Sequence, residues 1–148
     1  MKKIILALAF LTIGFTQAQI LEPVKWTTSV TKISSTEYEL VATATIDTKW
    51  HLYSQNVPAD GPIPTTFTFK SNGKYLKKGN TLEDKGHTVN DPVFNMQIKF
   101  FENKALFKQR IKLKDKAPFK VEGTVEFMVC DDTRCLPPSE VDLVFNIK

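Results

Sequence analysis

The feature that most constrains the fold is an alternation of apolar and polar residues that recurs along most of the chain. In the last such run Val141, Leu143, Phe145 and Ile147 form one fully apolar face, which is what a half-buried strand requires. No window of eleven or more residues beyond residue 18 has the apolar spacing of an amphipathic helix. The expected strands are rich in Val, Ile, Thr and Phe and cover Val24 to Ile33, Tyr38 to Ile46, Thr65 to Phe69, Ala105 to Leu113, Phe119 to Val129 and Val141 to Ile147.

Turn-forming residues separate these runs. Asn72-Gly73, Lys78-Gly79-Asn80 and Glu102-Asn103 favour tight connections, and the proline-rich segment Pro58 to Pro64 favours a loop. Several short strands at this spacing predict an all-β fold, an immunoglobulin-like antiparallel β-sandwich, with a closed β-barrel as the main alternative. A length of 148 residues fits one domain, and no repeat, low-complexity tract or linker divides the chain.

The N-terminus has the layout of a secretory signal peptide. It begins with two lysines, continues with an apolar run from Ile4 to Phe15 and ends in the small-residue exit Thr16-Gln17-Ala18. The run is short for a membrane span, and no cysteine lies near the cleavage point to carry a lipid anchor. We therefore expect residues 1–18 to be a signal peptide cut before Gln19, and residues 19–148 to be a single exported domain.

Composition and charge exclude two classes of protein. An aromatic content of 11% favours a packed core over a disordered chain. The formal net charge of +4 falls to +2 without Lys2 and Lys3, and the remaining charges are spread along the sequence. Nucleic acid is therefore not an expected partner.

The chain has two cysteines, Cys130 and Cys135, placed between the end of one expected strand and the start of the last. Two thiols are too few for a disulfide-dense mini-protein or a four-thiolate metal site. If the segment folds back as a hairpin, the two can come within disulfide distance. In an exported protein such a bridge is usually a structural staple.

Two properties of this pair argue against a staple. A bridge that closes about six residues removes roughly 2 kcal/mol of unfolded-state entropy, less than half of what a bridge across a domain removes. The alternation also puts Cys130 on the same side as Glu126, opposite the apolar side that Val125, Phe127 and Val129 share. We therefore expect an accessible disulfide away from the core, which is the type that exchanges with other thiols.

Charged neighbours predict different roles for the two sulfurs. Asp131 and Asp132 disfavour a thiolate at Cys130, whereas Arg134 favours one at Cys135. Cys135 is therefore the expected attacking thiol, and Cys130 the expected resolving thiol.

The run Cys130-Asp-Asp-Thr-Arg-Cys135-Leu-Pro-Pro, followed by one closing strand, resembles the N-terminal periplasmic domain of the thiol:disulfide interchange protein DsbD. That family domain is an immunoglobulin-like sandwich with two active-site cysteines on either side of a short connection. Trp50-His51-Leu52-Tyr53 is similar to its aromatic segment, and Asp91-Pro-Val-Phe94-Asn-Met96 to its cap loop. The resemblance implies that Phe94 covers the disulfide, with Asp91 as its acidic neighbour.

The resemblance also implies a function, that of a periplasmic protein-disulfide reductase without a cofactor. The reduced pair would pass electrons to oxidised thioredoxin-like proteins, such as disulfide isomerases or thioredoxins of cytochrome c maturation, with Cys135 forming the mixed disulfide. A thioredoxin-like domain would reduce the pair again. This sequence contains neither the multi-helix membrane domain nor the C-x-x-C domain of the full family protein. We therefore expect a separate reductant, with a membrane electron-transfer protein among the candidates.

Two other functions are compatible with the residues. The first is an immunoglobulin-like binding or adhesion module whose disulfide is purely structural. The second is a metal-binding chaperone, since His51 and His87 with the two thiols could in principle bind zinc. Neither histidine lies at a recognised ligand spacing from the cysteines, so we expect no metal site and ordinary surface or turn histidines. Trp26 and Trp50 are expected in the core.

Overall fold

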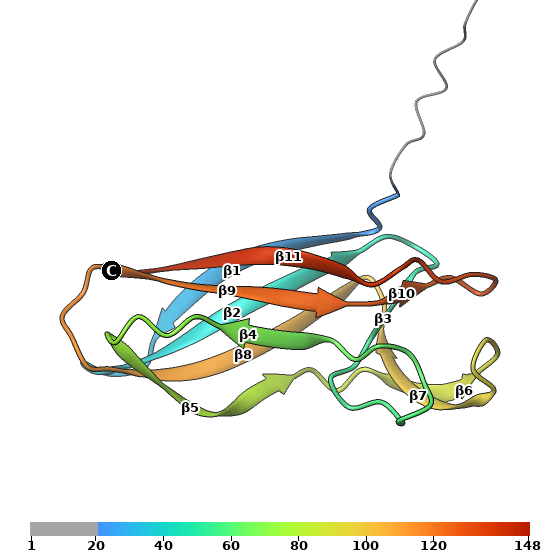
Figure 1. The fold of residues 1–148 in the computed structure, drawn as a ribbon, viewed down its shortest axis with the longest axis horizontal. Coiled ribbons are helices and arrows are strands. Elements are labelled where there is room, and N and C mark those ends of the chain that lie inside the picture. Colours follow the sequence, from blue (N-terminus) through green and yellow to red (C-terminus); the bar gives the residue numbers. More distant parts are fainter. Residues whose placement is uncertain (1–20) are drawn as a thin grey trace, which may run out of the picture.

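The structure, a computed structural model, describes residues 21–148, so the expected signal peptide lies outside the described residues. This part of the chain is all β, and no helix within it could span a membrane (Figure 1). Its strands are β1 (Val24–Lys32), β2 (Glu37–Ile46), β3 (His51–Tyr53), β4 (Thr66–Phe69), β5 (Tyr75–Glu83), β6 (His87–Asp91), β7 (Met96–Phe101), β8 (Lys104–Leu113), β9 (Phe119–Phe127), β10 (Val129–Cys130) and β11 (Ser139–Ile147).

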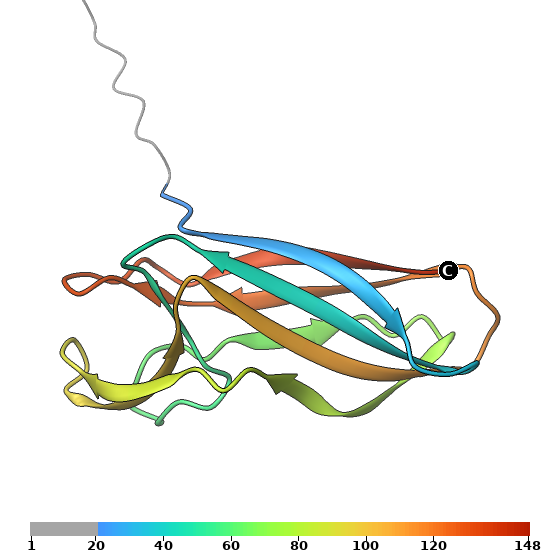
Figure 2. The same cartoon turned by 180° about the vertical axis from the view of Figure 1, so that it is seen from behind.

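The strands form three antiparallel sheets. The sheet β1-β2-β8-β5 packs face to face on the sheet β11-β9-β4, and a third sheet, β10-β3-β7-β6, extends the molecule at one end (Figures 1 and 2). We call this third sheet the end sheet. Each sheet keeps two edges, so the closed barrel is excluded. The immunoglobulin-like antiparallel sandwich predicted from the alternation is confirmed.

The core lies between the first two sheets and follows the alternation of the sequence. In β11 the side chains of Leu143, Phe145 and Ile147 are buried, while the residues between them are exposed. Trp26 packs against Phe107 of its own sheet, with 5.6 Å between ring centroids, and against Phe127 of the facing sheet, with 5.5 Å between centroids. The apolar residues of the alternating strands therefore form the interior of the sandwich, as expected for half-buried sheets.

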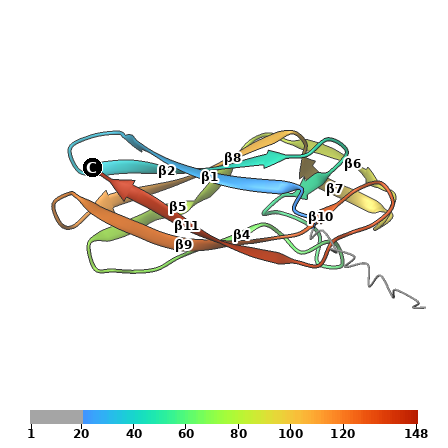
Figure 3. The ribbon, with the colours of Figure 1, turned by 90° about the horizontal axis from the view of Figure 1, so that it is seen from above.

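Two contacts fix how the layers meet. At one edge β1 and β11 lie side by side, and the Thr28 hydroxyl donates a hydrogen bond of 2.6 Å to the Val144 carbonyl (Figure 3). Within the second sheet β4 pairs closely with β9 because Gly123 has no Cβ, and a Cβ there would clash with the Thr68 carbonyl. A side chain at Gly123 would therefore push β4 off the sheet.

The strong alternating runs were predicted within one or two residues, and the structure corrects two details. The expected strand from Phe119 to Val129 is interrupted at Met128, which divides it into β9 and β10. The expected turn Lys78-Gly79-Asn80 lies inside β5 instead, as an irregularity in its pairing with β8 where Gly79 adopts a φ of 67°. Glycine tolerates this left-handed backbone, so the chain continues as a strand through a bulge.

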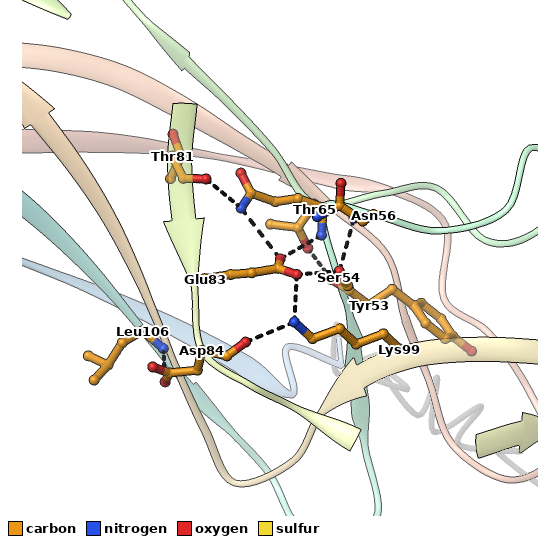
Figure 4. A network of polar contacts seen from close by, with 10 residues as sticks. Tyr53, Ser54, Asn56, Thr65, Thr81, Glu83, Asp84, Lys99 and Leu106 are labelled. Atoms are coloured by element: carbon orange, nitrogen blue, oxygen red, sulfur yellow. Dashed lines mark hydrogen bonds and ion pairs between the residues drawn. The ribbon is translucent and has the colours of Figure 1, made fainter. Parts of the chain in front are cut away.

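A partly buried polar network joins the end sheet to the sandwich (Figure 4). Glu83 at the end of β5 accepts hydrogen bonds from the Ser54 hydroxyl (2.5 Å), the Gln55 backbone N–H (2.8 Å) and Lys99 Nζ of β7 (2.9 Å). Lys99 also donates to the Asp84 carbonyl at 2.9 Å. Since Ser54 and Gln55 directly follow β3, one carboxylate holds β3, β5 and β7 together.

Replacing this carboxylate is expected to destabilise the fold. Burial opposes ionisation of Glu83, but hydrogen bonds from Ser54, Gln55 and Lys99 outweigh it and lower the pKa of the carboxyl. Glu83→Gln leaves the Lys99 ammonium without its counter-charge, so we expect a loss of about 2 kcal/mol in the free energy of unfolding near neutral pH. The measurement is urea denaturation, with Glu122→Gln on the exposed side of β9 as the control.

The pH dependence of that loss has a definite sign. A carboxyl with a lowered folded-state pKa stabilises the fold above its unfolded pKa, and this contribution disappears as the pH falls through the folded-state pKa. The difference between wild type and Glu83→Gln should therefore shrink in acid. A difference that is zero near neutral pH, or that grows on acidification, would contradict the assigned role of the network.

Candidate functional site

Cys130 and Cys135 form a disulfide within a tight hairpin. The Asp131 N–H donates to the Arg134 carbonyl (2.9 Å), and the Leu136 N–H donates to the Val129 carbonyl (2.9 Å). These bonds flank the cysteines, which therefore occupy a non-hydrogen-bonded antiparallel pair, the position where facing side chains come closest. Their Cα atoms are 4.0 Å apart. The fold-back predicted from the spacing is confirmed.

Asp131 builds the turn of this hairpin. Its Oδ1 accepts the Thr133 N–H (2.9 Å), the Thr133 hydroxyl (2.8 Å) and the Arg134 N–H (2.9 Å). These hydrogen bonds, Thr133 first, lower the pKa of the Asp131 carboxyl to about 2. The carboxylate is therefore committed to the turn conformation, which presents the two cysteines to each other.

The guanidinium of Arg134 makes two contacts, an ion pair with Asp131 and a cation–π contact with Trp50. Its Nε lies 3.3 Å from Asp131 Oδ2, and the guanidinium carbon lies 5.8 Å from the ring centroid of Trp50, in the segment before β3. Trp50 is buried, as predicted, and also supports this turn. The influence of Arg134 on a thiolate at Cys135 stays a prediction, and the Asp131 carboxylate partly balances the positive charge of Arg134.

Cys130 is buried and Cys135 is partly buried, which corrects the expectation of an accessible disulfide. The alternation correctly placed Cys130 outside the main core, yet Cys130 is only 1% exposed. It belongs to a second buried cluster on the end sheet, with Tyr53, Ile98 and Phe100. Cys135 is partly exposed at the rim of this cluster. Of the two cysteines, Cys135 is therefore the one that an incoming thiol is expected to reach.

Segments distant in sequence cover the second cluster. The partly buried side chains packed against it are Val57, Phe94, Met96, Met128 and Cys135. The loop that contains Pro58 to Pro64 contributes to this cover, because the Ile63 N–H points to the Met128 sulfur at 3.5 Å. Alternation within one strand reports which face a residue occupies and says nothing about what lies on that face, so the burial of Cys130 could not be predicted.

Phe94 lies in the turn between β6 and β7, at the same end of the molecule as the cysteine hairpin (Figures 1 and 2). It therefore does not begin a strand. Asp91, at 3% exposure, organises this turn: its Oδ1 accepts the N–H groups of Val93 (2.8 Å) and Phe94 (3.2 Å). The Phe94 ring packs edge-on against Tyr53, with 5.9 Å between centroids. We call residues 91–96 the aromatic turn.

Tyr53 links the aromatic turn to the end sheet and was not among the site residues predicted from the sequence. Its hydroxyl donates to Asp91 Oδ2 at 3.1 Å in a fully buried contact. Burial, followed by the negative charge and hydrogen bond of Asp91, raises the pKa of Tyr53 well above its usual range. Tyr53 therefore stays protonated and continues to donate. The available signal was its place in Trp50-His51-Leu52-Tyr53, the segment similar to the family's aromatic one.

The expectation of ordinary surface or turn histidines is wrong for His51. His51 lies in β3 directly opposite Cys130 of β10, and its side chain is 17% exposed. Its Nε2 is 3.2 Å from Glu102 Oε1, and its ring stacks on Phe100 with 4.2 Å between centroids. His87 is exposed at the start of β6. Among residues 21–148 no three Cys, His, Asp or Glu side chains gather as metal ligands.

A sandwich with a short-loop disulfide, in which Cys130 is buried and Cys135 packs with an aromatic turn on the same second cluster, defines a class of β-sandwich disulfide domains. Comparison with known families agrees. The family described as "Thiol:disulfide interchange protein DsbD, N-terminal" matches residues 17–145, and the chain belongs to this family. Its domains are periplasmic, act in thiol–disulfide exchange and interact with thioredoxin-like proteins. No curated protein matches the chain significantly.

A solved structure supports the fold, and a second is reported beside it. The N-terminal periplasmic domain of ScsB from Proteus mirabilis is similar with a TM-score of 0.57 and 11% identity, over 82% of this chain and 44% of that one. This chain thus spans less than half of the ScsB domain's length. The DsbD N-terminal domain of Neisseria meningitidis, in its reduced form, aligns with a TM-score of 0.44 and 14% identity over 82% and 83% of the two chains.

Proposed function

We propose that this chain is an exported, periplasmic thiol:disulfide interchange module in which Cys130 and Cys135 are the redox-active pair. It accepts electrons from a thioredoxin-like reductant, and a membrane electron-transfer protein can supply that reductant with electrons. It then passes them to oxidised thioredoxin-like proteins, including those of cytochrome c maturation. The observation that supports this most is the unequal exposure of the two cysteines, since a buried Cys130 and a partly exposed Cys135 favour attack at Cys135.

The chemistry follows from that order. A thiolate of the reductant attacks Cys135 Sγ, the Cys130–Cys135 bond breaks, and Cys130 leaves with the electron pair as a thiolate. The second thiol of the reductant then displaces Cys135, so both cysteines are reduced and the reductant leaves as a disulfide. Transfer to an acceptor runs the same steps in reverse. Phe94, in the turn that Asp91 organises, packs on the same cluster as Cys135, and this turn is the proposed cap that moves aside during both transfers.

Covalent capture tests this function. In Cys130→Ser the Cys135 thiol has no resolving partner, so it should form a stable mixed disulfide with an oxidised thioredoxin-like protein, visible on a non-reducing gel and lost with dithiothreitol. The wild-type pair should have a reduction potential above about −300 mV. The double variant Cys130→Ser with Cys135→Ser is the control. A potential well below that value together with no adduct would identify a structural bridge, as in the alternative of a binding or adhesion module.

A further inference from the structure

Three side chains, those of Cys130, His51 and Glu102, form a row across the end sheet. The exchange steps described above use Cys130 and leave His51 and Glu102 without a role. Cys130 of β10 pairs directly with His51 of β3, and His51 contacts Glu102, which follows β7. Directly opposite residues of an antiparallel pair share a face, with Cβ atoms about 4.5–5.5 Å apart. The buried sulfur thus has an imidazole as its neighbour across the sheet.

The contacts of His51 settle which of its nitrogens is available. Glu102 Oε1 is an acceptor, so the nitrogen 3.2 Å from it, Nε2, carries the hydrogen of the neutral ring. Nδ1 is then left with a free lone pair. Stacking on Phe100 at an interplanar angle of 24° holds the ring plane, because Phe100 is itself buried in the cluster that contains Cys130. The ring is therefore oriented from two sides.

Other charged groups near this row are occupied elsewhere. On the same face Asp91 of β6 bonds Tyr53 and the aromatic turn, and Asp131 beyond β10 bonds its own turn. His87 of β6 lies on the far side of Phe100, with 6.2 Å between ring centroids. His51, polarised by Glu102, is the titratable group that directly faces Cys130.

We propose that His51 exchanges a proton with Cys130 during disulfide exchange and that Glu102 positions it for this role. The proposal rests on the proposed function and adds to it how a sulfur without access to bulk water gains and loses its proton. In the oxidation direction the Cys130 thiol gives its proton to His51 Nδ1. The Cys130 thiolate then attacks Cys135 Sγ of the mixed disulfide.

That attack forms the Cys130–Cys135 bond and breaks the bond between Cys135 and the partner's sulfur. The partner's sulfur leaves with the electron pair as a thiolate, so two electrons have passed to the partner, and His51 releases its proton to solvent. In the reduction direction Cys130 leaves as a thiolate and His51 returns the proton. A side chain 17% exposed can exchange that proton with water.

A chromogenic aromatic disulfide, 5,5′-dithiobis(2-nitrobenzoate), isolates this step without a protein partner. The reduced protein should release one nitrothiobenzoate as Cys135 forms a mixed disulfide, then a second as Cys130 attacks it. The rate of the second release, measured between about pH 5 and pH 9, depends on the fraction of Cys130 that is present as thiolate. In His51→Phe we expect this rate to fall about tenfold at the acid end and its pH dependence to follow the ionisation of the Cys130 thiol alone.

Matched variants make the result decisive. His87→Phe removes the other histidine that contacts Phe100 and should keep the wild-type pH profile. Glu102→Gln should shift the profile toward that of His51→Phe by a smaller factor, which a purely structural contact would not do. If His51→Phe does not fold by near-ultraviolet circular dichroism, His51→Gln is measured in the same assay. If the folded His51 variants keep the wild-type pH profile, the proposal is overturned. If the profile shifts as expected but Cys130→Ser captures no thioredoxin-like protein, only the proposed function is overturned.

Discussion

Cys130 alone, in Cys135→Ser, is expected to react with iodoacetamide at least about 100-fold more slowly than Cys135 alone in Cys130→Ser. The reason is burial, since the Cys130 side chain is 1% exposed beneath the second cluster while Cys135 lies at its rim. A reagent reaches a buried thiol only through local opening, and a factor of 100 corresponds to an opening free energy of about 2.7 kcal/mol. The measurement is the rate of mass increase for each single-cysteine variant near neutral pH.

A folding control keeps this comparison meaningful. The short bridge contributes only about 2 kcal/mol, so both variants should keep the near-ultraviolet circular dichroism of the wild type. In denaturant both thiols should react at similar rates, because the difference depends on the fold. Equal rates in the folded variants would mean that the second cluster opens freely and that burial does not determine which sulfur a partner attacks.

The strands that could be predicted are those whose two faces differ. β11 alternates between buried and exposed residues along most of its length, so its period and its buried side were readable. β6 could not be predicted because four of its five residues are exposed, and β3 could not because three residues are too few to show a period. Both lie in the end sheet, so the sheet that carries the site was the part with the weakest signal.

The site was predictable where it depends on local sequence. The approach of Cys130 and Cys135 follows from a four-residue connection, and their pairing was anticipated. The neighbours of Cys130 depend on the pairing of β10 with β3 and on the position of the aromatic turn, which are separated from it by many residues. His51 therefore looked ordinary in sequence, although it lies directly across from the buried sulfur.

The aromatic turn gives the second large effect. Asp91→Ala is expected to lower the free energy of unfolding by about 3 kcal/mol and to speed reduction of the disulfide by dithiothreitol at least about tenfold. The substitution leaves the N–H groups of Val93 and Phe94 and the hydroxyl of Tyr53 without their acceptor. An unsatisfied buried donor such as the Tyr53 hydroxyl costs about 1–3 kcal/mol, the two partly buried N–H groups cost less, and a loosened turn exposes the cluster that contains Cys130.

Two variants separate the stability effect from the covering effect. Asp91→Asn keeps an acceptor oxygen for the turn, so it should lose less stability and reduce more slowly than Asp91→Ala. Phe94→Ala keeps the Asp91 hydrogen bonds that build the turn but removes the ring that packs on Tyr53. It should therefore speed reduction while costing only about 1 kcal/mol, because Phe94 is partly exposed. If Phe94→Ala reduces at the wild-type rate, the aromatic turn braces the end sheet without covering the disulfide, and access to Cys135 is then controlled by its own hairpin.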